Sequence, residues 1–227
     1  MTGASSAATP CTKQEVVGKL DAIPVFSLVN SAGQLFGVPD EQGEMAIRFY
    51  ADITDAGSAL VLVQSLNEAT PLRLDVTPLG TAFALCEGWK DTPSTLPLRL
   101  HAPSRVVQAV AEIMKAEPDQ RAFPLFGIDE LQSSRALPFF LRVRDMRQTW
   151  EASGRAAADF PQEYQVTDLR VVVHKMLTDT SVDWRTVMFV GSEEALLKAQ
   201  EIQVKAAEAY DPGDEPPPLE GDPDPSD

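Results

Sequence analysis

Residues 23–26 read Ile-Pro-Val-Phe, and residues 123–126 read Phe-Pro-Leu-Phe, so a proline among apolar side chains occurs twice in the same pattern. Three further matched pairs of segments follow in the same order: 45–55 (MAIRFYADITD) with 137–146 (LPFFLRVRDM), 76–85 (VTPLGTAFAL) with 166–175 (VTDLRVVVHK), and 96–109 (LPLRLHAPSRVVQA) with 186–199 (TVMFVGSEEALLKA). Self-similarity in a fixed order indicates a duplicated unit. We therefore expect two similar lobes related by a pseudo-two-fold axis, with a groove between them as a setting for binding.

The apolar pattern alternates between strand and helix periods, which predicts a layered α/β (α+β) fold. The expected strands are 24–29, 45–50, 72–76, 96–101, 123–126, 137–143 and 186–190, and the expected helices are 55–66, 78–88, 104–115, 145–153, 168–177 and 192–210. Val171–Val173 are β-branched, so a strand there is the alternative to the helix. Ser192 before two glutamates is typical of a helix N-terminus.

Composition changes at both ends of the chain divide it into four parts. We expect a flexible leader over 1–19, a first α/β repeat over 20–118, a second repeat with a C-terminal helix over 119–210, and a disordered tail over 211–227. The tail is acidic and rich in proline, with too few apolar residues to offset the entropy of ordering. The first residues are small and hydroxylated but lack arginine, so a trimmed presequence and a plain flexible terminus both remain open.

The 227 residues carry a formal charge of −15, and 44% of them are apolar, as in a globular protein. The tail holds seven of the 34 acidic residues and no base, which leaves 27 acidic against 19 basic residues in the rest of the chain. A negative surface repels phosphate, so nucleic acid is excluded as a partner, whereas basic or apolar polypeptides remain. The alternative is that the net negative charge serves only to keep the protein soluble and does not reflect a partner. No apolar run reaches the roughly 20 residues that span a bilayer.

The residue types that carry most enzyme chemistry do not gather in the sequence. Cys11 and Cys86 form no disulfide framework or metal motif, and an inert thiol is the expectation for Cys86. His101 and His174 have no nucleophile in a recognisable elbow beside them, so a structural role is expected. Gly33 and its neighbouring glycines form no phosphate-binding motif.

The acidic residues have the same structural interpretation. Asp52, Asp55, Asp145 and the pair Glu193-Glu194 stand at helix starts, where they compensate the helix dipole. The sequence therefore predicts no catalytic residue, no cofactor-binding residue, no metal ligand and no cofactor, and we expect a protein that is not an enzyme.

Most aromatic residues fall where a core is expected. Six phenylalanines lie on predicted strands: Phe26, Phe49, Phe126, Phe139, Phe140 and Phe189. We expect them to pack in the core, with an apolar groove for a client segment as the alternative. The tryptophans at 89, 150 and 184 lie near element ends, where they cover a core edge or line such a groove.

Over about residues 20–200 the chain resembles the family of the 22-kilodalton component of the chloroplast inner-envelope translocon (Tic), or a divergent paralogue. The resemblance is carried by Ile-Pro-Val-Phe (23–26), Asn30-Ser31, Phe-Pro-Leu-Phe (123–126), Asp145-Met146, Trp184 and Thr-Val-Met-Phe-Val (186–190). It departs from the family over 153–165 and after Tyr210. The resemblance rests on spacing and apolar pattern and includes no catalytic signature.

The resemblance implies a non-enzymatic, chaperone-like factor in protein import into plastids, which binds precursor proteins through apolar surface. The implied partners are precursor polypeptides or translocon subunits, without nucleic acid or a transmembrane segment, and peripheral membrane association stays open. The implied location is the chloroplast envelope intermembrane space, with the stroma as the alternative. A structural adaptor that docks one fixed partner, and an enzyme with an unrecognised site, are the competing hypotheses.

Overall fold

The computed structural model describes residues 8–40, 42–66, 70–92 and 94–208. Within them the strands are β1 Pro24–Asn30, β2 Val38–Pro39, β3 Met45–Tyr50, β4 Leu72–Pro78, β5 Leu98–His101, β6 Pro124–Gly127, β7 Leu137–Phe140, β8 Gln165–Asp168 and β9 Val187–Val190. The α-helices are α1 Lys13–Leu20, α2 Ile53–Leu66, α3 Leu79–Cys86, α4 Ser104–Met114, α5 Val143–Ala152, α6 Leu169–Thr178 and α7 Glu193–Glu208. The predicted disordered tail, 211–227, lies outside the described residues.

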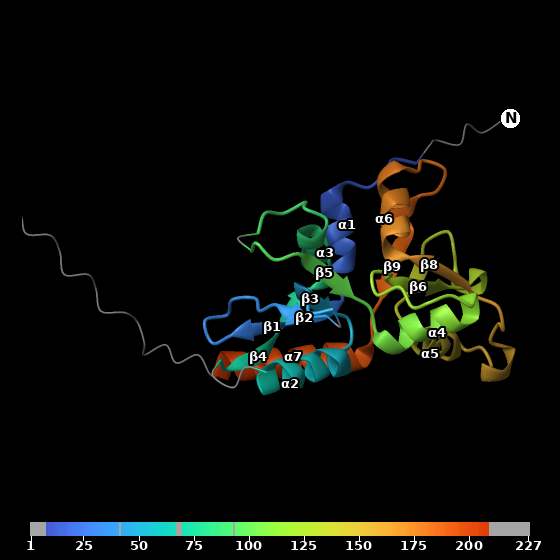
Figure 1. Ribbon diagram of the computed structural model, residues 1–227. Helices are drawn as coiled ribbons and strands as arrows, with labels where there is room; N and C mark the ends of the chain where they lie inside the picture. The colour runs from blue at the N-terminus through green and yellow to red at the C-terminus, as the bar shows by residue number, and fades with distance from the viewer. Residues whose placement is uncertain (1–7, 41, 67–69, 93, 209–227) are drawn as a thin grey trace, which may run out of the picture.

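Two sheets form the two sides of the molecule (Figure 1). Apart from β2, which pairs antiparallel with β3 in the first sheet alone, the two sheets have the same strand order and directions. In the first sheet β1 pairs antiparallel with β3 and β4, while β3 pairs in parallel with β5. In the second sheet β6 pairs antiparallel with β7 and β8, while β7 pairs in parallel with β9. These strands lie in the matched segments of the sequence repeat or overlap with them. The pseudo-two-fold axis itself stays a prediction.

The mixed α+β class is confirmed, and the core has three parts. The largest lies between the sheets and includes Val25, Phe49, Leu125 and Phe189, together with side chains of α1, α3 and α6. A second cluster covers the outer face of the first sheet around Phe26, and a third covers the outer face of the second sheet. All six strand phenylalanines are buried, as expected.

The halves exchange helices across the molecule (Figure 1). Helix α4 follows β5 of the first sheet, yet Val106 and Val110 pack on the outer cluster of the second sheet. Helix α7 follows β9 of the second sheet, yet Ala195 and Ala199 pack beside α2 on the first. Each sheet therefore depends on a helix from the other half, and the expected boundary between 118 and 119 does not separate two independent packing units.

The prediction of a flexible leader over 1–19 is wrong for residues 13–19, which lie in α1. Thr12 and Glu15 form a reciprocal capping box at its start, and Val16 and Leu20 are fully buried in the central core. Cys11 is buried beside them, and its N–H donates to the carbonyl of Met176 (2.8 Å). The capping box and the apolar pair four residues apart were readable in the sequence.

The helix predicted over 168–177 is confirmed as α6, so the alternative strand at 171–173 is wrong. Asp168 caps the helix by accepting the N–H of Arg170 (2.8 Å), and Leu169, Val172 and Met176 face the central core. Strands β2 and β8 were not expected, because they are short and mostly polar or interrupted by proline. Ser192 is confirmed at the start of α7, where its hydroxyl accepts the N–H of Ala195 (3.4 Å).

Candidate binding surfaces

Helices α2 and α7, which both pack on the outer face of the first sheet, each carry exposed apolar side chains. We call this set the outer apolar surface: Val61, Leu62 and Leu66 of α2 with Leu196, Leu197 and Val204 of α7. Each of these side chains is more than 40% exposed. The opposite sides of the two helices use small residues, such as Ala59 and Ala199, to pack closely on the sheet. Exposed apolar side chains on two helices of the same face favour a surface that binds protein.

Helix α4 on the second sheet carries a smaller exposed apolar pair at its C-terminal end. Ile113 and Met114 are 60% and 69% exposed, whereas Val107 and Ala111 of the same helix are buried. Lys115 ends the helix in the left-handed conformation, with φ of 50°. The equivalent helices α4 and α7 therefore both present apolar groups outward.

A hollow of about 500 Å³ lies between α5 and α7, where the two halves meet. Arg142 and Asp145 line it where β7 leads into α5, and Glu194 and Leu197 line it from α7. Leu197 connects this hollow to the outer apolar surface.

Arg142 ties three junctions between strand and helix together. Its Nε donates to Asp145 Oδ2 (3.0 Å), and its Nη2 donates to the Ser192 hydroxyl before α7. Its Nη1 lies 3.6 Å from Glu194 Oε2 and 4.0 Å from Asp52 Oδ2 at the start of α2. Because Asp145 is only 7% exposed, its charge depends on this guanidinium. Asp52, Asp145 and Glu194 do stand at helix starts, as expected, but their shared partner was not predicted.

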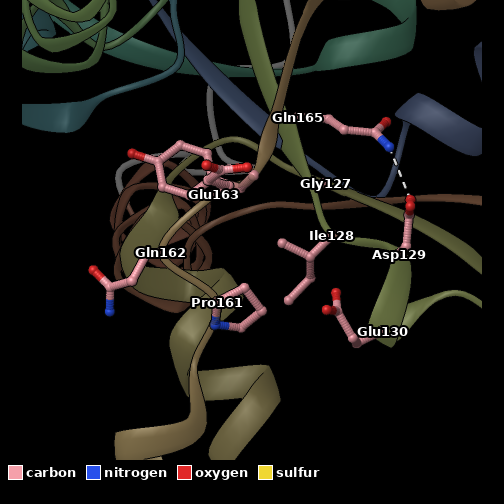
Figure 2. Close-up of a pocket in the computed structure, with 9 residues that line it drawn as sticks. Gly127, Ile128, Asp129, Glu130, Pro161, Gln162, Glu163 and Gln165 are labelled. Atoms are coloured by element: carbon pink, nitrogen blue, oxygen red, sulfur yellow. Dashed lines mark hydrogen bonds between the residues drawn. The ribbon is translucent and has the colours of Figure 1, made fainter.

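A second hollow, of about 620 Å³, lies at the start of β8 and is lined by residues 127–130 and 161–165 (Figure 2). Three carboxylates face it, from Asp129, Glu130 and Glu163. Gln165 Nε2 donates to Asp129 Oδ1 across the hollow (2.8 Å). No lysine or arginine is among the lining residues. We call this the acidic hollow.

His101 is half-buried and has a serine beside it, which the sequence reasoning did not anticipate. Its Nε2 lies 3.3 Å from Ser104 Oγ, and its ring packs edge-on against Tyr50. Burial lowers the pKa of His101, and the nearby Asp55 carboxylate opposes that shift. Asp55 Oδ2, however, accepts the backbone N–H of Ser104 (2.7 Å) and so caps α4. The carboxylate does not orient the imidazole, which a catalytic triad requires.

The other candidate reactive groups lie apart from one another. His174 is exposed on α6, away from His101 on β5. Burial raises the pKa of both thiols, that of Cys86 to about 12, so both stay protonated at neutral pH. In the described part of the chain, no group of three or more histidine, cysteine or acidic residues is arranged to hold a metal. Nor is any described helix long and apolar enough to cross a membrane.

The three tryptophans pack in the core or against it. Trp150 is 5% exposed and donates its indole N–H to the carbonyl of Ala156 (2.9 Å). Trp184 is buried in the central core, and Trp89 packs edge-on against Phe83 beneath Lys13. The groove-lining alternative therefore rests on the exposed aliphatic residues of the outer helices.

Comparison with known families decides what kind of chain this is. A sequence model described as the Tic22-like family matches residues 1–203, most of the chain. The chain belongs to the Tic22-like family.

Solved Tic22 structures share the fold of this Tic22-like chain. "Anabaena Tic22 (protein transport)" is 16% identical, with a TM-score of 0.62, and the match covers 84% of this chain and 97% of that one. Tic22 from Plasmodium falciparum is 14% identical, with a TM-score of 0.63, and the match covers 84% and 98%. At these identities the likeness shows the fold alone. No curated protein sequence matches the chain significantly.

The family resemblance stated from the sequence is confirmed, and it extends further than expected. The sequence pattern was recognised over about 20–200, whereas the Tic22-like match begins at residue 1 and includes α1. The match covers all of α4 and most of α7, the two helices that the halves exchange.

Proposed function

We propose that this chain is a non-enzymatic, chaperone-like factor of protein transport, which binds unfolded precursor polypeptides on the outer apolar surface. Membership of the Tic22-like family and the protein-transport description of the Anabaena structure support the general role. The proposed location is the plastid envelope, in its intermembrane space, with the stroma as the alternative.

The outer apolar surface is the observation that carries the proposal. Val61 and Leu66 of α2 are 67% and 69% exposed, and Leu197 of α7 is 54% exposed. Burying one such side chain against a client contributes about 1.5–3 kcal/mol at most. Several of them together allow micromolar binding to many sequences, because apolar contact needs no particular side-chain geometry. Strong net negative charge keeps a protein with such a surface soluble.

The test is protection of a chemically unfolded protein, such as rhodanese, against aggregation, followed by light scattering. The wild-type chain should suppress scattering, and the double variant Leu62→Lys/Leu197→Lys should lose most of that effect. The matched control, Val171→Lys/Val182→Lys, adds the same charge at exposed apolar positions on and after α6. This control variant should still suppress scattering. Equal protection by both variants would refute the assignment of the surface.

The adaptor hypothesis makes a different prediction in the same assay. If the chain only docks one fixed partner, the wild-type protein should not suppress scattering at micromolar concentration. Removing residues 211–227 separates the two hypotheses. An adaptor that docks through this tail should lose its partner, whereas a chain that binds clients on its outer helices should still suppress scattering after the deletion.

A further inference from the structure

The edge strand β8 of the second sheet leaves backbone groups unpaired. Among the described strands it pairs only with β6, and the N–H of Leu169 donates to the carbonyl of Phe123 (2.9 Å). In the antiparallel register this makes Leu125 and Thr167 a hydrogen-bonded pair. The next residue, Val166, therefore turns its N–H and C=O away from the sheet.

Two other edge strands have side-chain donors on their carbonyls, and β8 has none. Gln64 Nε2 donates to the carbonyl of Leu72 on β4 (3.2 Å), and Lys19 Nζ donates to that of Val187 on β9 (3.1 Å). No side chain in the described ranges hydrogen-bonds to the backbone of β8, and Val166 is 39% exposed. An open edge of this kind pairs readily with another extended chain.

The acidic hollow continues this edge at the start of β8 (Figure 2). Gln165 belongs both to the strand and to the wall of the hollow. Glu130 and Glu163 form no ion pair with any residue that the structure describes, so their charges are available. Asp129 has one oxygen engaged by amides of Gln132 and Gln165.

We propose that the β8 edge and the acidic hollow bind an extended, basic segment of another polypeptide. The segment adds a strand beside β8, and its Lys or Arg side chains lie against Glu130 and Glu163. Backbone hydrogen bonds supply affinity without demanding a sequence, and the carboxylates select for positive charge.

Charge excludes the other occupants. A second copy of this chain would bring two acidic hollows together, and the chain's own tail over 211–227 has seven acidic residues and no base. Nucleic acid is repelled for the same reason. This site lies on the second sheet, whereas the outer apolar surface covers the first, so the inference does not rest on the proposed function.

The first test is fluorescence anisotropy with a labelled peptide that alternates Lys and Val, and with its counterpart that alternates Glu and Val. The basic peptide should bind at least about tenfold more tightly than the acidic one. The variant Glu130→Gln/Glu163→Gln should weaken binding of the basic peptide by about 3- to 30-fold, less at high salt. Both positions are exposed, so this variant should fold.

The second test removes the outward N–H with Val166→Pro, which leaves the bonds of Thr167 to β6 in place. Binding should weaken by about 3- to 10-fold. Val76→Pro is the matched control. Val76 on β4 pairs with Phe26 of β1 in the same way as Val166 on β8 pairs with Phe126 of β6. It should leave peptide affinity unchanged, and circular dichroism checks that both variants are folded.

Several results would overturn the inference: no binding of the basic peptide, equal binding of both peptides, or no effect of Glu130→Gln/Glu163→Gln. A dimer seen by analytical ultracentrifugation and abolished by Val166→Pro would instead assign the edge to a second copy. Protection of unfolded rhodanese should persist in all these variants, so failure here is distinguishable from failure of the proposed function.

Discussion

Replacing Gly80 by alanine should destabilise the protein, although alanine is the better helix former. Gly80 lies in the first turn of α3, where α1 packs against it (Figure 1). A Cβ there would overlap the carbonyl oxygen of Val17 and lie 2.6 Å from Asp21 Oδ1. The obstacle is largely backbone, so α1 must shift away from α3.

The size of the effect follows from what that shift disturbs. Thr81 donates its N–H to Asp21 Oδ1 (3.1 Å), and Val16 and Leu20 are fully buried. Overpacking of this kind costs about 1–3 kcal/mol, and the helix preference of alanine returns up to about 1 kcal/mol. We expect a net loss of about 1–2 kcal/mol and a Tm lower by about 2–8 °C.

Urea unfolding followed by circular dichroism measures the free energy of unfolding directly. Gly57→Ala in α2 is the matched control, since nothing lies within 4 Å of its added Cβ. That variant should gain up to about 1 kcal/mol. If Gly80→Ala is as stable as the wild-type protein, the close docking of α1 on α3 is wrong.

Arg142→Met should lower the free energy of unfolding by about 2–3 kcal/mol, because it leaves the Asp145 carboxylate buried without its partner. The pKa of His101 is lowered by burial, so the unfolded chain binds its proton more readily. Wild-type stability should therefore fall as pH drops from about 7 to 5, and His101→Gln should show a shallower loss in urea titrations at each pH. Cys11 and Cys86 have raised pKa values and should react with a thiol-specific disulfide reagent only after unfolding.

A matched variant separates the effect at Arg142 from general damage. Arg185→Ala breaks an exposed pair with Asp183 and should leave the free energy of unfolding nearly unchanged. Rapid labelling of either thiol in the folded protein, or an Arg142 variant as stable as Arg185→Ala, would contradict the burial described above.

The sequence repeat predicted the sheets well because both halves use the same apolar strands. Phe26 and Phe126 occupy equivalent places, and each faces an aromatic residue of the next strand, Tyr50 or Phe140. What the repeat could not predict was the exchange of α4 and α7. Chain order places α7 with the second half, and only tertiary packing puts Ala199 on the first sheet.

The binding surfaces were harder to predict than the fold. Leu196 and Val204 of α7 are both more than 40% exposed, and the helix packs through Ala195 and Ala199. A close helix contact favours small residues, which hydrophobic periodicity undervalues. The acidic hollow combines residues 127–130 with 161–165, and no local pattern indicates that these segments meet.

Site-specific photo-cross-linking tests the central claim most directly. A cross-linking residue is placed at Leu62 or Leu197 on the outer apolar surface, or at Val171 on α6, and unfolded rhodanese is added before irradiation. We predict strong cross-links from positions 62 and 197 and weak ones from 171, although all three are about half exposed. Equal yields from the three positions, or cross-links from position 171 alone, would contradict client binding on the outer helices.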